Sequence, residues 1–215
     1  MKYTYIKVYK DVKYTYIKVH KVPNYTYIDN RTCFWCRFNC KGSKDFISDE
    51  GDAEVMDAEA HRKKVREFLA RPPFSKRNIS KKDLTLFCTA LTHDSHSNEH
   101  ESVESYERLE FLGDAVVELI VCDHIFHSPI SSEGNMTTQK QEFVANRKMS
   151  AKLLEKGLGL EDVMLVGHGH IDKTTKTKHL EENMRADSFE AIIGAFYLVY
   201  GLEETRRVVT DTLIS

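Results

Sequence analysis

The sequence Tyr106-Glu-Arg-Leu-Glu-Phe-Leu-Gly-Asp-Ala-Val-Val-Glu118 combines helical periodicity with a row of acidic residues. Glu107, Glu110 and Asp114 are spaced i, i+3 and i+7, so they project from one face of a helix, and Glu118 continues that face. The residues between them are mostly apolar, which is typical of a buried helix. Carboxylates of like charge destabilise a helix at these spacings, and they cost much more when buried without a partner. A divalent cation resolves the conflict, because Mg²⁺ prefers carboxylate oxygens and water as ligands.

A second acidic pair lies in the apolar stretch Ala186-Asp-Ser-Phe-Glu-Ala-Ile-Ile-Gly-Ala195. Asp187 and Glu190 are spaced i, i+3 and share a helix face. Two carboxylates from each of two packed helices would form a cage for Mg²⁺, which can activate water and stabilise the leaving oxygen of a phosphodiester. Gly113 and Gly194 would allow the two helices to approach closely. The alternative is a solvated acidic face without a metal, and the spacing alone leaves both interpretations open.

The rest of the chain beyond residue 60 also has the period of helices. A short apolar face precedes Pro72, and another follows Ser80, which is a suitable N-cap. Strand patterns are sparse beyond residue 45. The longest helical patterns cover Tyr106–Phe126, Thr137–Lys156 and Met184–Tyr200, and a further one begins at Val208. The body is therefore predicted to be all-α.

The N-terminal segment repeats with a period of eleven residues. Lys2–Val8 recurs as Lys13–Val19 and in part as Asn24–Asp29, with Tyr and Ile alternating with Thr and Lys. This alternation fits β-strands, so the three copies could form a small meander. It also fits a low-complexity segment with no fixed fold, because the strands would have little to pack against. A basic stretch interleaved with aromatic residues could also stack on RNA bases.

Charge is distributed unevenly along the 215 residues. Residues 1–45 contain ten Lys or Arg and three Asp, a net charge of +7, which leaves −9 on the rest because the whole chain carries −2. Residues 46–60 are small and acidic, and they are predicted to link the N-terminal segment to a domain at 61–215. An acidic body does not attract RNA phosphates. If it acts on RNA, divalent cations or a separate basic module must offset its charge.

Composition and hydropathy indicate an intracellular protein. Hydrophobic residues make up 41% of the chain and charged residues 30%, as is usual for a soluble globular protein. The longest apolar run, Ala191–Leu202, is too short for a membrane helix, and the N-terminus lacks the apolar stretch of a signal peptide. Five cysteines, an odd number, argue against a disulfide scaffold. The expected compartment is the nucleus or the cytoplasm, with no membrane association.

The two acidic stretches resemble the signature motif and the second catalytic motif of the ribonuclease III family. Shorter elements agree with that family in order and spacing: a Leu-Thr-His element at Ala90–Ser95, an acid-containing turn at Glu133–Thr137 and the following helix at Val144–Asn146. The resemblance covers residues 60–215. It implies an all-helical ribonuclease III endonuclease domain that dimerises or pairs with a second such domain. Within the family, Asp114–Glu118 and Gly167–Gly169 are most similar to the first catalytic domain of Drosha-type nucleases.

The resemblance also implies a reaction and a set of site residues. The reaction is Mg²⁺-dependent hydrolysis of both strands of an RNA duplex, with Mn²⁺ as a substitute ion, 5′-phosphate products and short 3′ overhangs. Carried over by motif, the catalytic residues and metal ligands are Glu110, Asp114, Asp187 and Glu190. Glu107 and Glu133 match accessory acids that help to bind metal, substrate or the partner subunit. Phe111 matches an aromatic residue inserted into the partner at the dimer interface, and core packing is the alternative.

The sequence departs from the family pattern after the catalytic motifs. Family members usually carry a C-terminal double-stranded-RNA-binding domain, and no basic segment of that kind follows the catalytic motifs in this sequence. The chain is therefore expected to be a fragment, to act as a homodimer, or to obtain RNA affinity from a separate RNA-binding partner. The main alternative function is a non-catalytic ribonuclease III-like module, RNA-associated or used for dimerisation. A different metal-dependent phosphohydrolase is a remoter alternative.

The cysteines allow one further metal site. Three of them are closely spaced and could form a Cys₃His zinc site with His20, or they could be reduced thiols in an aromatic-rich segment. These three are Cys33, Cys36 and Cys40. Cys88 and Cys122 occupy apolar faces and are expected in the core.

Three histidines outside the acidic motifs are further candidates for a functional role. His168 and His170 flank a glycine and could bind a metal, although the Lys-rich stretch that follows favours an exposed loop without one. His93 is expected to be a helix-end or core histidine with hydrogen bonds rather than a general base.

Overall fold

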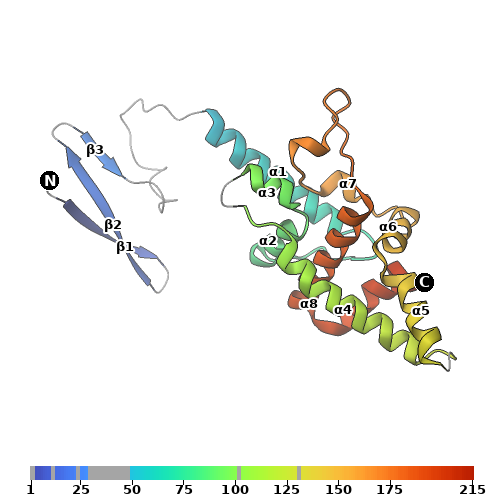
Figure 1. The fold of residues 1–215 in the computed structure, drawn as a ribbon. Helices are drawn as coiled ribbons and strands as arrows, with labels where there is room; N and C mark the ends of the chain where they lie inside the picture. Colours follow the sequence, from blue (N-terminus) through green and yellow to red (C-terminus); the bar gives the residue numbers. More distant parts are fainter. Residues whose placement is uncertain (1–2, 11–12, 23–24, 29–48, 101–102, 130–131) are drawn as a thin grey trace. The chain divides into compact units, whose positions relative to one another are not determined.

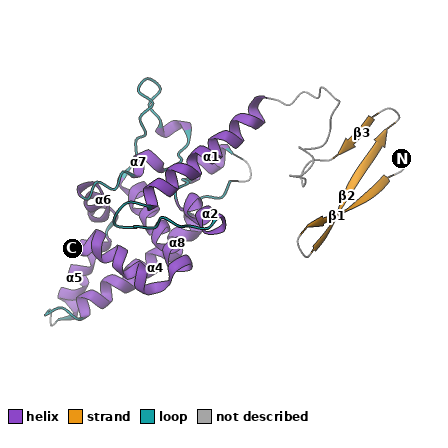
Figure 2. Ribbon diagram, turned by 180° about the vertical axis from the view of Figure 1, so that it is seen from behind, coloured by secondary structure: helices purple, strands orange, loops and turns teal. Residues whose placement is uncertain are grey.

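The computed structural model of the protein describes residues 3–10, 13–22, 25–28, 49–100, 103–129 and 132–215 (Figure 1). The chain divides into two compact units, Met1–Ser48 and Asp49–Ser215. The first contains a small antiparallel sheet and the second is a helical body (Figure 2). Among the residues described, no helix is long and apolar enough to cross a membrane.

The repeated N-terminal segment forms a three-stranded meander. Each copy of the repeat supplies one strand: β1 (Tyr3–Lys10), β2 (Lys13–Val22) and β3 (Tyr25–Ile28). The order is β1-β2-β3 and both pairs are antiparallel, with Ile6 opposite Ile17 and His20 opposite Tyr27. Of the two structural interpretations of the repeat, the meander is the one present here. The three cysteines predicted as zinc ligands or free thiols lie outside the described residues.

The body is all-α, as predicted. Its helices are α1 (Asp49–Leu69), α2 (Lys81–Ala90), α3 (Asp94–Glu99), α4 (Glu107–Phe126), α5 (Glu133–Val144), α6 (Asn146–Glu155), α7 (Leu160–Val163) and α8 (Glu182–Val209), followed by a π-turn at Thr210–Ile214. Within residues 49–100, 103–129 and 132–215 there is no strand, and the β-bridges are isolated. Ser80 caps α2 as predicted, because its Oγ accepts a hydrogen bond from the backbone N–H of Asp83 over 3.1 Å.

Two helix boundaries differ from the prediction. Helix α1 begins at Asp49, so the stretch 46–60, predicted as a linker, is helical over most of its length. The Ala and Glu residues of this stretch favour a helix, although the sequence has no apolar stripe there that would predict one. The pattern Thr137–Lys156, predicted as one helix, is divided into α5 and α6 at Ala145, whose ψ of 128° is extended. No Gly or Pro marks this break in the sequence, and the packing of α6 against α8 favours it.

Helix α8 is the centre of the body. It packs along α4, and α6 and α2 cover other parts of its surface (Figure 2). Its middle is buried on all sides, as fully covered Phe189, Ile192 and Ile193 illustrate. The backbone of Gly201, with φ 77° and ψ 179°, interrupts α8 immediately after Tyr200, where the sequence predicts the helix to end.

An aromatic cluster joins α8 to the first two helices. Phe74 lies between Phe68 and Phe196, with ring centroids 5.0 and 5.5 Å away, and Phe87 lies 5.4 Å from Phe196. All four side chains are at most 2% exposed. Burial of each such side chain contributes about 1.5–3 kcal/mol, so the cluster fixes α8 within the body.

Candidate metal centre

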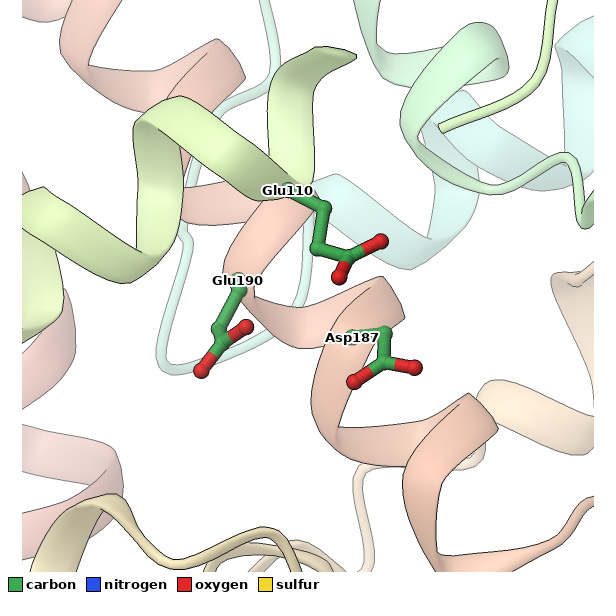
Figure 3. Close-up of side chains that lie close together, drawn as sticks. All are labelled: Glu110, Asp187 and Glu190. Carbon is green, nitrogen blue, oxygen red and sulfur yellow. The ribbon is translucent and has the colours of Figure 1, made fainter. Parts of the chain in front are cut away.

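Three carboxylates from two crossing helices meet in the body. Glu110 belongs to the first turn of α4, and Asp187 and Glu190 lie one turn apart on α8. One carboxylate oxygen of each residue can be chosen so that all three lie within 4.8 Å of one another (Figure 3). This set is named the carboxylate cluster below. Hard divalent cations take oxygen ligands of this kind, so the cluster fits Mg²⁺ or Mn²⁺.

Burial makes the charged state of the cluster costly. Glu190 is only 6% exposed, whereas Glu110 and Asp187 are half-buried. Burial, together with the negative charges of Asp114 and Asp187, raises the pKa of Glu190 from 4.5 to about 8. Burial and the charges of Asp187 and Glu107 raise the pKa of Glu110 to about 7. Burial also raises the pKa of Asp187, and a hydrogen bond from Asn146 opposes that rise.

Among the described residues, no cationic side chain pairs with the carboxylates of the cluster. In the part of the chain that the structure describes, no ion pair involves Glu110, Asp187 or Glu190. A buried carboxylate without a partner either keeps its proton or needs a cation. The arrangement can therefore hold a divalent ion, and binding would displace protons from the cluster.

Asp114, the fourth predicted ligand, lies outside the carboxylate cluster. It follows Glu110 by one turn of α4 and its side chain is exposed. Its charge nevertheless raises the pKa of both Glu190 and Glu110, so it lies within electrostatic reach of the site. The structure thus brings together three of the four predicted ligands and leaves the fourth, with its short side chain, at the edge.

The accessory acids are also outside the cluster. Glu107 is exposed and accepts a hydrogen bond from the hydroxyl of Ser105 over 3.0 Å, while its charge raises the pKa of Glu110. Glu133 is in the first turn of α5, exposed, and accepts a hydrogen bond from Thr137 Oγ1 over 2.9 Å. Neither residue is placed as a ligand by this geometry.

Glu118 continues the acidic face of α4 toward α5. Its Oε1 lies 2.9 Å from Lys140 Nζ of α5, and this hydrogen bond raises the pKa of Lys140. The charge of Glu118 also raises the pKa of Glu190. The acidic face of α4 therefore extends beyond the carboxylate cluster as far as Glu118, which pairs with Lys140.

One polar residue at the site was not predicted. The side-chain amide of Asn146 donates a hydrogen bond to Oδ1 of Asp187 over 3.1 Å. The sequence contained a signal, because Asn146 ends the motif Val144-Ala-Asn146, but that motif indicated only a helix. The break at Ala145, which brings the amide to the cluster, has no signature in the sequence.

Phe111 is 83% exposed, so the core-packing alternative for this residue is wrong. It begins a row of exposed apolar side chains along α4, which is named the α4 stripe. The stripe consists of Phe111, Ala115, Leu119, Cys122 and Phe126. The prediction that Cys122 belongs to the core is therefore also wrong, and Cys88 is half-buried.

Two of the candidate histidines, His93 and His168, make local contacts with α3. His93 caps α3, where its Nδ1 accepts a hydrogen bond from the backbone N–H of Ser95 over 3.1 Å, which confirms a helix-end role. His168 and His170 form a 3₁₀ turn, and Nδ1 of His168 lies 2.5 Å from a carboxylate oxygen of Glu99. This contact ties the turn to α3.

Comparisons with known proteins place the body in one family. The model of the ribonuclease-III-like family matches residues 83–215. Ribonuclease 3 of Onion yellows phytoplasma (strain OY-M) is 37% identical over 142 residues, which are 66% of this chain and 57% of that protein. Ribonuclease 3 of Chlorobaculum tepidum is 37% identical over 136 residues, 60% of this chain and 48% of that protein. The chain thus spans about half the length of the curated relatives it matches.

Solved structures agree with the sequence relatives. A crystal structure of the nuclease domain of ribonuclease III from Campylobacter jejuni has a TM-score of 0.53 and 25% identity, over 71% of this chain and 96% of that chain. A second structure of that domain concerns flexibility in a region involved in dimer formation. It has a TM-score of 0.51 and 28% identity, over 63% of this chain and 90% of that chain.

Proposed function

Because the chain belongs to the ribonuclease-III-like family, we propose that it is an endoribonuclease that hydrolyses double-stranded RNA with a divalent metal ion. The observation that carries the proposal is the carboxylate cluster itself. Three carboxylates, one of them 6% exposed, face one another without an ion pair among the described residues. A structural role alone gives no reason to bury them, because apolar side chains in their place would be more stable.

The roles of the residues follow from their positions. Glu110, Asp187 and Glu190 would hold Mg²⁺, or Mn²⁺ in its place, with Asp114 at the edge of the site. When bound, the ion supplies a water of lowered pKa and stabilises charge on the phosphate and the departing 3′ oxygen. Glu190, whose pKa is about 8, keeps a proton near neutral pH until a cation displaces it. Cleavage by this mechanism is expected to leave 5′-phosphates and short 3′ overhangs.

Two active sites would act on the two strands of a duplex if two such domains pair. The α4 stripe supports pairing with a second copy of the chain or with a second ribonuclease III domain, because isolated exposed apolar residues are common but a continuous row is not. The Campylobacter jejuni domain, for which dimer formation is named, supports the same assignment. Phe111, which is more exposed than Leu119 and Phe126 of the same stripe, would insert into the partner.

RNA affinity requires a source of positive charge. Residues 46–215 carry a net charge of −9, so the acidic body would repel a duplex without bound cations. The basic N-terminal segment or a separate RNA-binding partner would offset this charge. An intracellular compartment remains a prediction, and the bacterial relatives give no support to the nucleus. The finer resemblance to Drosha-type nucleases also remains a prediction.

The direct test is cleavage of a perfect RNA duplex by the purified chain at low salt, with Mg²⁺ and with EDTA. Glu190→Gln and Asp114→Asn should each abolish Mg²⁺-dependent cleavage and leave the circular dichroism spectrum unchanged. Glu203→Gln is the matched control, because Glu203 is an exposed acid of α8 that lies outside the cluster. Normal cleavage by either site variant would reject the role given to that residue.

The alternative is a non-catalytic member of the family. Such a module would be folded, would associate, and would leave the duplex intact at any metal concentration. A large excess of protein over RNA separates this case from weak RNA binding, because excess protein restores cleavage only if the chain is an enzyme.

A further inference from the structure

Asn146 is the first residue of α6, and its side-chain amide lies beside the carboxylate cluster. Nδ2 donates hydrogen bonds to Oδ1 of Asp187 over 3.1 Å and to Oδ1 of Asn183 over 3.4 Å. An amide nitrogen carries two N–H groups, so both are directed at α8. The bond to the carboxylate is the stronger of the two, because its acceptor is ionisable and the distance is shorter.

The backbone holds this amide in place. Ala145, whose ψ is 128°, separates α5 from α6, and α6 begins at Asn146 in a new direction. Met149 and Leu153 of α6 are at most 2% exposed, and α6 packs against α8. The packing of α6 against α8 therefore fixes the position of the Asn146 amide relative to Asp187.

Asp187 is the member of the cluster that receives the hydrogen bond from Asn146. It is half-buried, and its carboxylate must face Glu190, one turn further along α8, and Glu110 on α4. A carboxylate has two oxygens, so one can accept from the amide while the other faces a cation. The hydrogen bond from the Asn146 amide already restricts the rotamers of Asp187. Less side-chain entropy is therefore lost when Asp187 binds a metal.

We propose that Asn146 is a positioning residue of the metal centre, which holds the Asp187 carboxylate in the orientation that a divalent cation requires. This inference rests on the proposed function, because it takes the carboxylate cluster as the metal site. Residues that hydrogen-bond to metal ligands typically change metal affinity or activity between about 10-fold and 100-fold when they are replaced. Asn146 is expected to act in this way on affinity, without itself touching the metal or RNA.

The test measures Mn²⁺ binding by isothermal titration calorimetry on the full chain, together with cleavage at increasing Mg²⁺. Asn146→Ala removes the donor, and Asn146→Leu removes it while keeping a similar volume. Gln141→Ala is the control, because Gln141 is exposed near the same helix break and its side chain lies on α5. Thermal unfolding in EDTA checks that each variant is folded.

Both Asn146 variants should weaken Mn²⁺ binding between about 10-fold and 100-fold, with an unchanged unfolding temperature in EDTA. Saturating Mg²⁺ should restore most of kcat, which a damaged fold would not allow. The control should bind Mn²⁺ like the unmodified chain. Parental Mn²⁺ affinity in both Asn146 variants would overturn the inference.

Asp187→Asn separates this inference from the proposed function. If this variant loses Mn²⁺ binding while the Asn146 variants keep it, the metal site stands and the role of Asn146 is rejected. If the unmodified chain does not bind Mn²⁺, the metal site and the role of Asn146 are both rejected. If the expected losses of Mn²⁺ binding occur but the unmodified chain does not cleave RNA even at a large excess of protein, the positioning role stands and the nuclease activity does not.

Discussion

The backbone of Glu190 lies directly against Gly113. A Cβ atom built on Gly113 would be 1.7 Å from the carbonyl oxygen of Glu190 and 2.4 Å from its carbonyl carbon. Gly194 makes the reciprocal contact, because its Cβ would lie 2.3 Å from the carbonyl oxygen of Leu109. Real Cβ atoms do not approach backbone this closely, so only glycine allows α4 and α8 to cross here. This crossing distance sets how far Glu110 lies from Glu190.

Gly113→Ala should therefore destabilise the fold. The added methyl group must push α8 away from α4, and overpacking that shifts backbone costs about 1–3 kcal/mol and occasionally more. Urea unfolding followed by circular dichroism would measure the loss. Gly134→Ala on α5 is the control, because nothing lies within 4 Å of the Cβ that it adds. An unchanged midpoint for Gly113→Ala would mean that the helices can separate freely.

The stability of the metal-free chain should fall as pH rises. The pKa of Glu190 is about 8 in the folded chain against an ordinary 4.5, and that of Glu110 is about 7. The folded state therefore binds these protons more tightly than the unfolded state, so the free energy of unfolding decreases between about pH 4.5 and 8. Thermal unfolding in EDTA across this range would measure the decrease.

Glu190→Gln isolates the contribution of one carboxyl group to this pH dependence. The variant should be more stable than the parent in EDTA at pH 8.5 and similar to it at about pH 3.5, because the parent carboxyl is protonated in both the folded and the unfolded state well below its ordinary pKa of 4.5. The exposed control Glu203→Gln should follow the parent at every pH. A parent-like slope for Glu190→Gln would show that another group causes the decrease.

Metal affinity should have the opposite pH dependence. A cation must displace the protons that Glu190 and Glu110 retain near neutral pH, so Mn²⁺ should bind more tightly at pH 8.5 than at pH 6. Calorimetry in buffers of different ionisation enthalpy should detect proton release on binding at pH 7. Equal affinity at both pH values would indicate that the cluster is already ionised without metal.

Phe111→Asp should weaken self-association without unfolding the monomer. Phe111 is 83% exposed, so little of its side chain contributes to the core of one copy. Substitutions at such positions usually change stability by about 0.5 kcal/mol or less. Sedimentation velocity over a range of concentrations would measure the association. Leu154→Asp, on exposed Leu154 of α6, is the control, and equal association of the parent and both variants would exclude the α4 stripe as the interface.

The sequence by itself determined which residues share a helix face. The spacing of Glu107, Glu110 and Asp114 predicted one acidic row on an otherwise apolar helix, and Asp187 with Glu190 predicted a second. The all-α body and the Ser80 cap followed from the same local rules, because helix period and capping depend only on neighbouring residues. The predicted helical pattern Met184–Tyr200 also stops where Gly201 interrupts α8.

Tertiary structure decided which members of those rows meet. Asp114 shares the face of Glu110 but lies outside the carboxylate cluster, whereas Asn146, from a helix that the sequence did not separate, donates to Asp187. Tertiary structure also decided the environment of Phe111. Helical periodicity allowed either a dimer contact or core packing for this residue, and the fold leaves it exposed. The physical reason is that a helix face is fixed by local geometry, while the distance between two helices depends on close backbone contacts between residues far apart in the chain, as at Gly113 and Glu190.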